Sequence, residues 1–291
     1  MSFLKSPKNP RTNRKVVRVI LCAIVVSYLA FCADFFVRQE WYLLEPNVDP
    51  PGYPVSRKTE FSYVPFTLSG ETIKGGAATI HYRKYSTTVT PRNGVVFYLH
   101  GNKGNMDKCE FQIEFVLELG YDVWTMDYRG YGDSDGKISE AALKKDARAV
   151  FDKIVAEVDA ESLVIWGRSF GSGVAASVAA STQKKPKMLV LETPYWSLVD
   201  AAWQKWAMVP PALFRYELPI HEFLMSANCP IHLIHGTLDE KIPFNSSERL
   251  LDLRLSHGIN VKGHSIMCGM HDLRDEKTVA DFEEKAATIL K

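Results

Sequence analysis

Short apolar runs alternate along most of the chain with longer stretches whose apolar residues recur at helical spacing. Continuous apolar runs are typical of strands buried in a parallel sheet, whereas alternating apolar and polar residues are typical of half-buried antiparallel strands. Strands are expected over 60–68, 77–85, 95–99, 122–126, 163–166, 188–191, 231–234 and 259–266, and helices over 107–119, 140–158, 174–179, 246–255 and 277–290. This alternation predicts an α/β fold with a mostly parallel central sheet and helices on both faces.

One apolar stretch near the N-terminus is of a different kind. Residues 19–33 are apolar apart from the polar atoms of Ser27 and Tyr28, and extending the stretch to 16–37 gives 22 residues. A helix of that length rises about 33 Å, which is enough to cross the hydrocarbon core of a bilayer. The cations that precede the first acid, Asp34, are Lys5, Lys8, Arg11, Arg14, Lys15 and Arg18. The pattern predicts a basic cytoplasmic tail over 1–15, a membrane anchor helix over 16–37 and a non-cytoplasmic location for the remainder.

A cleaved signal peptide is the alternative, because residues 30–33 (Ala-Phe-Cys-Ala) are a fair cleavage site and the product would be secreted or periplasmic. The prolines between positions 46 and 54 disfavour both helix and strand ladder. Residues 38–58 are therefore expected to form a linker or a surface strap, and residues 59–291 the catalytic domain. Every candidate for chemistry lies beyond residue 100, so the anchor is expected to take no part in the reaction.

Composition excludes some classes of function. Lys and Arg number 35 against 34 Asp and Glu, so no global charge favours nucleic acid as a partner. The five cysteines show neither a disulfide framework nor zinc spacing. No phosphate-binding GxxxxGK[ST] sequence is present. We expect no metal and no cofactor, and the oligomeric state is not readable from the sequence.

The segment Gly167-Arg168-Ser169-Phe170-Gly171 separates the apolar run 163–166 from a stretch with helical spacing. A strand, Gly-x-Ser-x-Gly and a helix in that order are the context of a nucleophile elbow. Its glycines let strand and helix approach closely, and the helix N-terminus favours negative charge that develops beside the serine. Ser169 is therefore the expected nucleophile, and the alternative is a glycine-rich turn with an incidental serine.

Five segments in this order resemble the α/β-hydrolase superfamily, and more closely its HGNxGN-bearing branch of membrane-anchored serine hydrolases of the Bem and ABHD types. They are HGNKGN (100–105), DYRGYGDSDG (127–136), GRSFG (167–171), HGTLDEKIP (235–243) and GMHDL (269–273). The resemblance covers residues from about 60 to 291. It implies the α/β-hydrolase fold with a small lid and acyl transfer through a serine.

Acyl transfer through serine needs a base beside the hydroxyl and a carboxylate that orients the base. In the fold implied by the resemblance, the chain order is serine, acid, histidine. Asp239 follows the expected strand 231–234 and is the expected acid, with Glu240, Asp200 and Glu192 as alternatives.

The expected base is His271, because it follows Gly269 on the loop after the last expected strand, where the histidine of the family lies and where ligands meet open α/β sheets. His264 and His257 are the alternatives. His264 lies inside that strand pattern, and His257 lies at the end of a helix.

Two backbone N–H groups are expected to form an oxyanion hole. The resemblance places one at Phe170, directly after the nucleophile, and the other in the HGNKGN loop, at Asn102 or, as second choice, Lys103. A lid is expected over 194–228, where Trp196, Trp203 and Trp206 would contact substrate. The alternative for this aromatic segment is a helix packed on the core.

Together these interpretations predict a membrane-anchored serine hydrolase. Its small-molecule substrate would be an acyl ester, lipid-like ester or thioester, cleaved through an acyl-enzyme on Ser169. A serine peptidase or amidase would use the same residues, and a non-catalytic interaction module on this fold is the alternative from another class.

Overall fold

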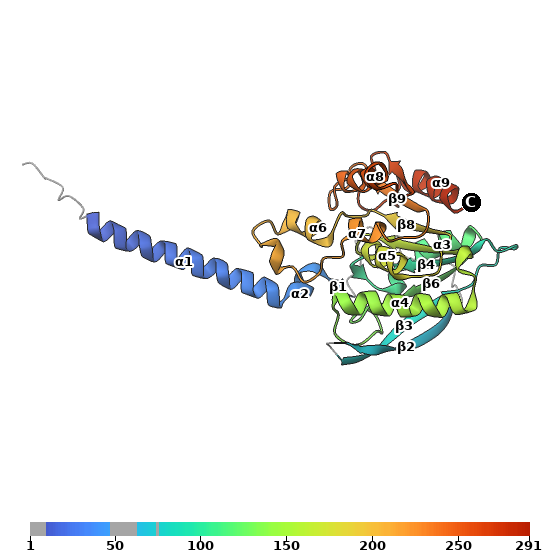
Figure 1. Ribbon diagram of the computed structural model, residues 1–291, viewed down its shortest axis with the longest axis horizontal. Coiled ribbons are helices and arrows are strands. Elements are labelled where there is room, and N and C mark those ends of the chain that lie inside the picture. Colours follow the sequence, from blue (N-terminus) through green and yellow to red (C-terminus); the bar gives the residue numbers. More distant parts are fainter. Residues whose placement is uncertain (1–9, 47–62, 74–75) are drawn as a thin grey trace, which may run out of the picture.

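A computed structural model of the 291-residue chain describes residues 10–46, 63–73 and 76–291 (Figure 1). The described part centres on an eight-stranded sheet in the order β10-β9-β8-β7-β4-β6-β3-β2. Its strands are β2 (Tyr63–Ile73), β3 (Gly76–Tyr85), β4 (Gly94–Leu99), β6 (Tyr121–Met126), β7 (Leu163–Arg168), β8 (Met188–Glu192), β9 (Ile231–Gly236) and β10 (Val261–Ile266). The pairs β2–β3 and β3–β6 are antiparallel and the other pairs are parallel. The expected α/β architecture is confirmed.

Helices cover both faces of this sheet. Consecutive residues of a strand point to opposite faces, so each buried strand contributes side chains to both layers of helices. The helices are α3 (Glu110–Glu118), α4 (Glu140–Glu157), α5 (Phe170–Ser181), α8 (Asn245–His257) and α9 (Val279–Leu290). On β7, Ile165 belongs to one buried cluster with Val150 of α4 and Val174 of α5. Its neighbour Trp166 belongs to a second cluster, on the other face, with Phe282 of α9. These two clusters are the hydrophobic core.

The element boundaries differ from the expected ones by a few residues. The helix expected over 107–119 is split into a 3₁₀ turn, η1 (Met106–Cys109), and α3. The first strand begins at Tyr63 among the described residues, and positions 60–62 of the expected strand lie outside them. None of these differences moves a strand to another place in the sheet.

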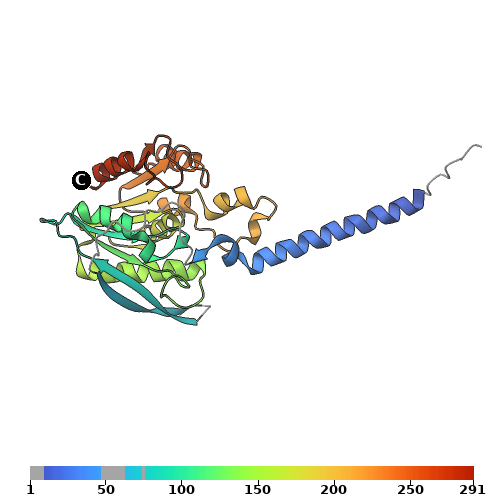
Figure 2. The same ribbon diagram turned by 180° about the vertical axis from the view of Figure 1, so that it is seen from behind.

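A single long helix, α1 (Pro10–Val37), projects from the domain (Figures 1 and 2). Its segment Arg14–Val37 is long and apolar enough to cross a membrane, by length and composition. The side chains of residues 14–30 are exposed on all sides of the helix. Of the expected basic tail 1–15, residues 10–15 already belong to the helix, and residues 1–9 lie outside the described residues.

The expected linker begins with regular structure. Helix α2 (Gln39–Leu43) is followed by β1 (Glu45–Pro46), which pairs in parallel with β5 (Lys103–Gly104). The expectation of neither helix nor ladder, which applies from Trp41 to Arg57, is therefore wrong for residues 41–43 and 45–46. Its physical reason is the position of the prolines, all of which lie at or beyond 46 and so leave the helix free of them. Residues 47–58 of the expected linker lie outside the described residues.

The chain between β8 and β9 forms a cap over the carboxyl ends of the strands, and we call residues 194–228 the lid. It contains α6 (Leu198–Lys205), the 3₁₀ turn η3 (Pro211–Leu213) and α7 (Ile220–Leu224). A third apolar cluster joins this lid to α1 and consists of Phe35, Ala202, Val209 and Phe214. The foot of the long helix is thus packed on the lid.

The fold contains a buried ion pair whose loss should be measurable. Arg129, after β6, donates to Asp146 of α4 from Nε at 2.7 Å and from Nη2 at 2.9 Å, and both side chains are at most 3% exposed. We expect Asp146→Ala to lower the free energy of unfolding by about 3–5 kcal/mol, because it removes the carboxylate that two nitrogens of the buried guanidinium contact. The matched control is Asp152→Ala, which removes an exposed pair with Arg148 on the same helix and should cost under about 1 kcal/mol. Urea unfolding in detergent measures both, and equal losses would contradict the argument.

Candidate active site

Ser169 lies in a strained turn between β7 and α5. Its backbone has φ 50° and ψ −120°, and its N–H donates to the carbonyl of Glu192 at 2.8 Å. A Cβ on Gly167 would lie 2.3 Å from the carbonyl oxygen of Gly171, and one on Gly171 would lie 2.2 Å from that of Leu99. Both glycines are therefore required by close backbone contact, as the sequence pattern indicated. The turn presents Ser169 at the carboxyl edge of the sheet.

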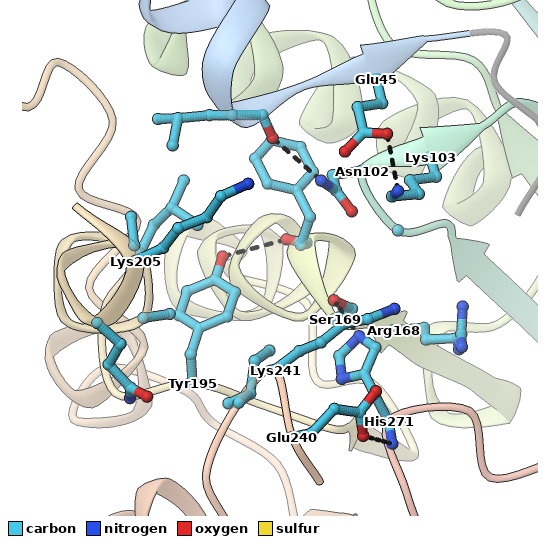
Figure 3. A pocket seen from close by; sticks show the side chains of 18 of the residues that line it. Glu45, Asn102, Lys103, Arg168, Ser169, Tyr195, Lys205, Glu240, Lys241 and His271 are labelled. Carbon is cyan, nitrogen blue, oxygen red and sulfur yellow. Dashed lines mark hydrogen bonds and ion pairs between the residues drawn. The ribbon is translucent and has the colours of Figure 1, made fainter. Parts of the chain in front are cut away.

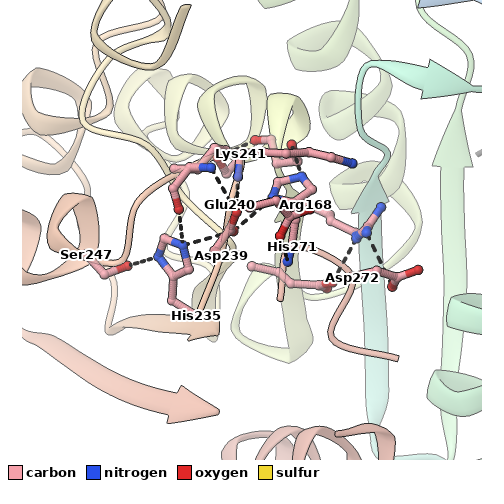
Figure 4. Close-up of polar contacts among 12 residues, drawn as sticks. Arg168, His235, Asp239, Glu240, Lys241, Ser247, His271 and Asp272 are labelled. Carbon is pink, nitrogen blue, oxygen red and sulfur yellow. Dashed lines mark hydrogen bonds and ion pairs between the residues drawn. The ribbon is translucent and has the colours of Figure 1, made fainter. Parts of the chain in front are cut away.

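The structure brings Ser169, His271 and Asp239 into one chain of hydrogen bonds. Ser169 Oγ lies 3.1 Å from His271 Nε2, and His271 Nδ1 lies 2.8 Å from Asp239 Oδ2 (Figures 3 and 4). Asp239 comes from the loop after β9 and His271 from the loop after β10. All three side chains are buried. Because these strands are parallel, their carboxyl ends carry residues far apart in sequence to the same edge.

The Asp239 carboxylate is held by several donors. His235 Nε2 lies 3.1 Å from Oδ2, and the backbone N–H groups of Lys241 and Ile242 each donate to Oδ1 at 2.8 Å. Burial opposes ionisation, but the hydrogen bonds from His235, His271 and Ile242 outweigh it and hold the pKa of Asp239 well below its usual value. Asp239 is therefore ionised at neutral pH.

His235 was missed by the sequence reasoning as a partner of the acid. Its Nδ1 lies 2.7 Å from Ser247 Oγ on α8, so its ring bridges that helix and Asp239. The signal in the sequence is its position: His235 lies near the end of the strand expected before Asp239, four residues ahead of that acid.

His271 is poised as a neutral base. Burial lowers its pKa, the cations of Arg168 and Lys241 lower it further, and together they outweigh the raising effect of the Asp239 carboxylate. The neutral imidazole can accept a proton on Nε2 while Nδ1–H donates to the carboxylate.

The alternative acids have other partners. Asp200 on α6 pairs with Arg249 at 3.0 Å on the surface. Glu192 is completely buried at the end of β8 and pairs with Arg168 at 3.0 Å and also with Arg274. Glu240 accepts from the backbone N–H of His271 at 3.3 Å rather than from its ring.

The alternative bases are also placed elsewhere. His264 on β10 lies 3.0 Å from His232 Nδ1 on β9, and His257 lies 2.7 Å from Ser256 at the end of α8. Neither has a recorded contact with Ser169 among the described residues.

A buried ionic cluster lies beneath the serine, and the sequence reasoning missed it. Glu192 holds Arg274 and Arg168, and Arg168 Nη2 also lies 3.6 Å from Asp272, the residue after His271. Figure 4 shows Arg168 reaching from the elbow strand to the histidine loop. The two parts of the site are thus tied together by charge as well as by the Ser169–His271 contact.

The two expected oxyanion donors flank Ser169. Phe170 is the first residue of α5, so its N–H has no intrahelical acceptor. The loop with Asn102 is fixed by its carbonyl, which accepts from Glu45 N–H at 3.0 Å and from Tyr131 O–H at 2.9 Å. The side-chain amide of Asn102 donates to the Leu43 carbonyl at 3.0 Å, so its backbone N–H stays the expected oxyanion donor. Lys103 lies next to it in β5, and its side chain pairs with Glu45 at 2.7 Å.

A cavity of about 590 Å³ opens beside Ser169 and His271. Its lining combines the catalytic edge with α2, the oxyanion loop and α6; the residues are Tyr42, Leu43, Glu45, Gly101, Asn102, Lys103, Arg168, Ser169, Phe170, Tyr195, Leu198, Ala201, Ala202, Gln204, Lys205, Trp206, Glu240, Lys241, Ile242, His271 and Asp272. Figure 3 shows Lys205 and Lys241 entering the cavity from different sides. Within the part of the chain that the structure describes, neither lysine forms an ion pair. The cavity therefore joins an apolar and aromatic wall to two lysines, of which Lys205 has its Nζ 5.6 Å from the centre of the Trp206 ring.

Of the three lid tryptophans expected to contact substrate, Trp206 lines this cavity. Trp196 and Trp203 are not among its described lining residues. Trp196 stacks on His221 with ring centroids 4.3 Å apart, and Trp203 donates from Nε1 to the Val209 carbonyl at 3.2 Å. Among the described residues, no three His, Cys, Asp or Glu side chains gather in a metal-binding group.

Comparison with known proteins places this site in a family. The family model of the alpha/beta hydrolase fold matches residues 94–247, which is more than half of the chain. The chain belongs to the α/β-hydrolase fold family. That match includes Ser169 and Asp239 and ends before His271.

Lysophosphatidylserine lipase ABHD12 of Danio rerio is 30% identical over 205 residues, covering 62% of this chain and 52% of that protein. The protein of the same name from Mus musculus is 29% identical over 188 residues, covering 58% of this chain and 47% of its own length. The chain thus spans about half the length of these two relatives.

Solved structures share the fold at low identity. An esterase of Pyrococcus furiosus matches with a TM-score of 0.64 and 19% identity, covering 84% of this chain and 98% of that one. A carboxyl esterase of Bacillus coagulans matches with a TM-score of 0.65 and 14% identity, covering 79% and 98%. These likenesses show the fold.

The charges around the two histidine sites give a testable contrast. Burial is the main cause that lowers the pKa values of His271, His232 and His264; beyond it, Lys241 lowers that of His271 and Lys262 lowers those of His232 and His264. We therefore expect Lys241→Met to raise the pKa of His271 and leave that of His264 unchanged, and Lys262→Met to do the reverse. Histidine-selective NMR titration measures both. A His271 pKa that stays the same in Lys241→Met would show that this charge is screened by solvent.

Proposed function

We propose that this chain is a serine ester hydrolase in which Ser169 is the nucleophile, His271 the general base and acid, and Asp239 the carboxylate that orients His271. The observation that carries the proposal is the continuous contact from Ser169 Oγ through His271 to Asp239, at 3.1 Å and 2.8 Å. The membership in the α/β-hydrolase fold family and the lipases among its relatives support it.

The chemistry follows from this geometry. Ser169 Oγ attacks the acyl carbonyl carbon while its proton passes to His271 Nε2, and the ionised Asp239 stabilises the resulting imidazolium. The N–H groups of Phe170 and Asn102 receive the developing oxyanion, aided by the N-terminus of α5. His271 then returns the proton to the leaving alkoxide, which departs as an alcohol. Water then attacks the acyl-enzyme while its proton passes to His271, and His271 returns that proton to Ser169 Oγ as the acyl–Oγ bond breaks and the fatty acid leaves.

The cavity favours a single-chain lipid ester with an anionic head group. Its wall holds Tyr42, Leu43 and Trp206 for an acyl chain, and Lys205 and Lys241 supply positive charge without a recorded ion pair among the described residues. The relatives that are lysophosphatidylserine lipases by name act on a substrate of this chemistry. We take a lysophospholipid with a net negative head group as the proposed substrate class; an uncharged amide substrate would gain no ion pair from these lysines.

The proposal includes the membrane. The apolar segment of α1 would anchor the chain, and the described cations Arg14, Lys15 and Arg18 before the first acid favour a cytoplasmic N-terminus and a non-cytoplasmic domain. Protease protection of intact vesicles distinguishes this orientation from the opposite one, and N-terminal sequencing distinguishes it from signal cleavage near residue 33.

The roles of the three site residues can be separated by activity. We expect Ser169→Ala to abolish fluorophosphonate labelling, and Ser169→Ala and His271→Ala each to lower kcat by about 10⁴-fold or more, with the double variant little worse. Asp239→Asn should lower kcat by about 10⁴-fold, whereas Asp200→Asn, on the surface, should change it little. Near-normal turnover in His271→Ala, or a larger loss in Asp200→Asn than in Asp239→Asn, would refute the assignment.

The head-group preference rests on Lys205, which does not contact the catalytic residues in the described structure. We expect Lys205→Met to raise KM for a lysophosphatidylserine by about tenfold, because a hydrogen bond to a charged group contributes about 1.5–3 kcal/mol. KM for the neutral monoacylglycerol of the same chain length should not change. Lys145→Met, on α4, is the control variant. Equal effects on the two substrates would show that Lys205 contributes packing rather than charge.

A further inference from the structure

The tip of the lid lies against the membrane-crossing part of α1. Tyr28 Oη on α1 donates to the carbonyl of Met208 at 2.9 Å. Met208 also borders an apolar groove formed with one side of the helix, whose other residues are Ile20, Ala23, Ile24, Ser27, Tyr28 and Phe31. Figure 1 shows the loop after α6 reaching alongside the base of α1. The lid therefore contacts residues of the apolar segment itself.

Positions along α1 indicate how deep Met208 would lie in a bilayer that this helix crosses. Tyr28 precedes Asp34, the first acid after the apolar run, by six residues, which is about 9 Å along a helix axis. Asp34 pairs with Arg38 at 3.1 Å, and the exposed Trp41 follows one turn later. Charged pairs and tryptophan are typical of the membrane–water interface. A bilayer that covers the apolar run of α1 would therefore also cover Met208.

The side chains at the lid tip are of the kind that lipid favours. Met208 is 69% exposed and Trp203 is 46% exposed. On α1, Phe36 is also exposed, although its neighbour in sequence, Phe35, is buried. The described residues at 206–209 are Trp, Ala, Met and Val, without a charge. Exposed apolar side chains that continue an apolar helix favour lipid over water as their neighbour.

The lid cannot be placed independently of α1. Phe35 is fully buried against Val209 and Phe214, and its ring centroid lies 5.4 Å from that of Trp206. Gln39 Nε2 donates to the Leu213 carbonyl at 2.7 Å, and Gln39 Oε1 accepts from Arg215 N–H at 2.6 Å. These contacts fix the depth of the lid once the helix is inserted.

The same junction walls the cavity. Tyr42 and Leu43, just after α1, and Ala202 and Trp206 of the lid line it together with Ser169. The cavity thus extends from the nucleophile toward the place where helix and lid meet.

From these contacts we infer that the lid tip, residues 206–209, is immersed in the apolar layer of the leaflet next to the domain, and that the cavity receives its acyl substrate sideways from that leaflet. The occupant of the exposed apolar surface is the bilayer, because the surface continues the lipid-facing side of α1. This inference rests on the proposed membrane anchor and deepens the proposed function.

Depth-dependent quenching tests the immersion in the full chain reconstituted in phosphatidylcholine vesicles. Met208→Cys, made after the exposed Cys22 and Cys268 are changed to Ser, carries a fluorescent probe. The matched control is Leu255→Cys, 80% exposed on α8, which leads into the amino end of β10 at the sheet edge opposite Ser169. We expect quenching by nitroxide-labelled acyl chains only at position 208 and by aqueous iodide only at position 255.

Iodide quenching at position 208 equal to that at 255 would overturn immersion, provided that carbonate washing leaves the protein in the vesicles. Extraction by carbonate would overturn the anchor and this inference together. A probe at 208 shielded from both quenchers would overturn immersion in favour of a protein partner or a second copy. Turnover of a water-soluble short-chain ester, measured in the same samples, tests the hydrolase proposal separately.

Activity tests the sideways entry. We expect Met208→Asp to lower kcat/KM for a lysophospholipid presented in vesicles by about tenfold or more, because a carboxylate at this depth is costly. Turnover of the short-chain ester should not change, since Met208 lies outside the cavity lining. Met208→Leu should keep the lipid activity of the unchanged chain, and Leu255→Asp should have no effect on either substrate. Equal losses on both substrates would show a folding defect of the lid and contradict entry from the leaflet.

Discussion

The site depends on keeping one carboxylate ionised while it is buried. Asp239 loses water on folding, and four donors replace it: the rings of His235 and His271 and the N–H groups of Lys241 and Ile242. These donors come from β9, the turn that follows it and the loop after β10. The carboxylate therefore requires β9 and β10 to be neighbours in register, and His271 is oriented as a result of that requirement.

A second buried acid, Glu192 at the end of the neighbouring strand β8, also holds parts of the site in place. Glu192 has two arginine partners, and one of them, Arg168, also meets Asp272. Because the Glu192 carbonyl accepts from Ser169 N–H, one residue fixes both the elbow and the cation that faces the histidine loop. A network of this kind stabilises geometry only when all its members are present, since one missing partner leaves a buried charge.

The sequence was informative where a local pattern and the rule of parallel strands suffice. Ser169 follows from the glycines around it, and Asp239 and His271 from their places after strands, so their proximity could be predicted. Contacts between distant segments could not. Nothing near Glu45 indicates that it pairs with the Asn102 loop, and nothing near Phe35 indicates a lid partner. Trp196, Trp203 and Trp206 are all lid tryptophans, and the sequence does not distinguish them. Which of them faces the cavity depends on how the lid folds back over the site.

The two-residue ladder between β1 and β5 connects the segment after the apolar helix to the loop beside Ser169. A chain shortened past β1 would therefore have a less ordered loop at the site. The Asn102 carbonyl accepts from Glu45 N–H, and the Asn102 side-chain amide donates to the Leu43 carbonyl. The loop beside Ser169 is therefore ordered by residues that follow the apolar helix. A protein cut within α2 or β1 would retain Ser169, Asp239 and His271 but lose this ordering. Its loop would have more conformations before substrate binds, and the entropy of fixing them would oppose binding of the transition state. A fragment that begins after β1 and the full chain would therefore differ in preorganisation even at identical chemistry.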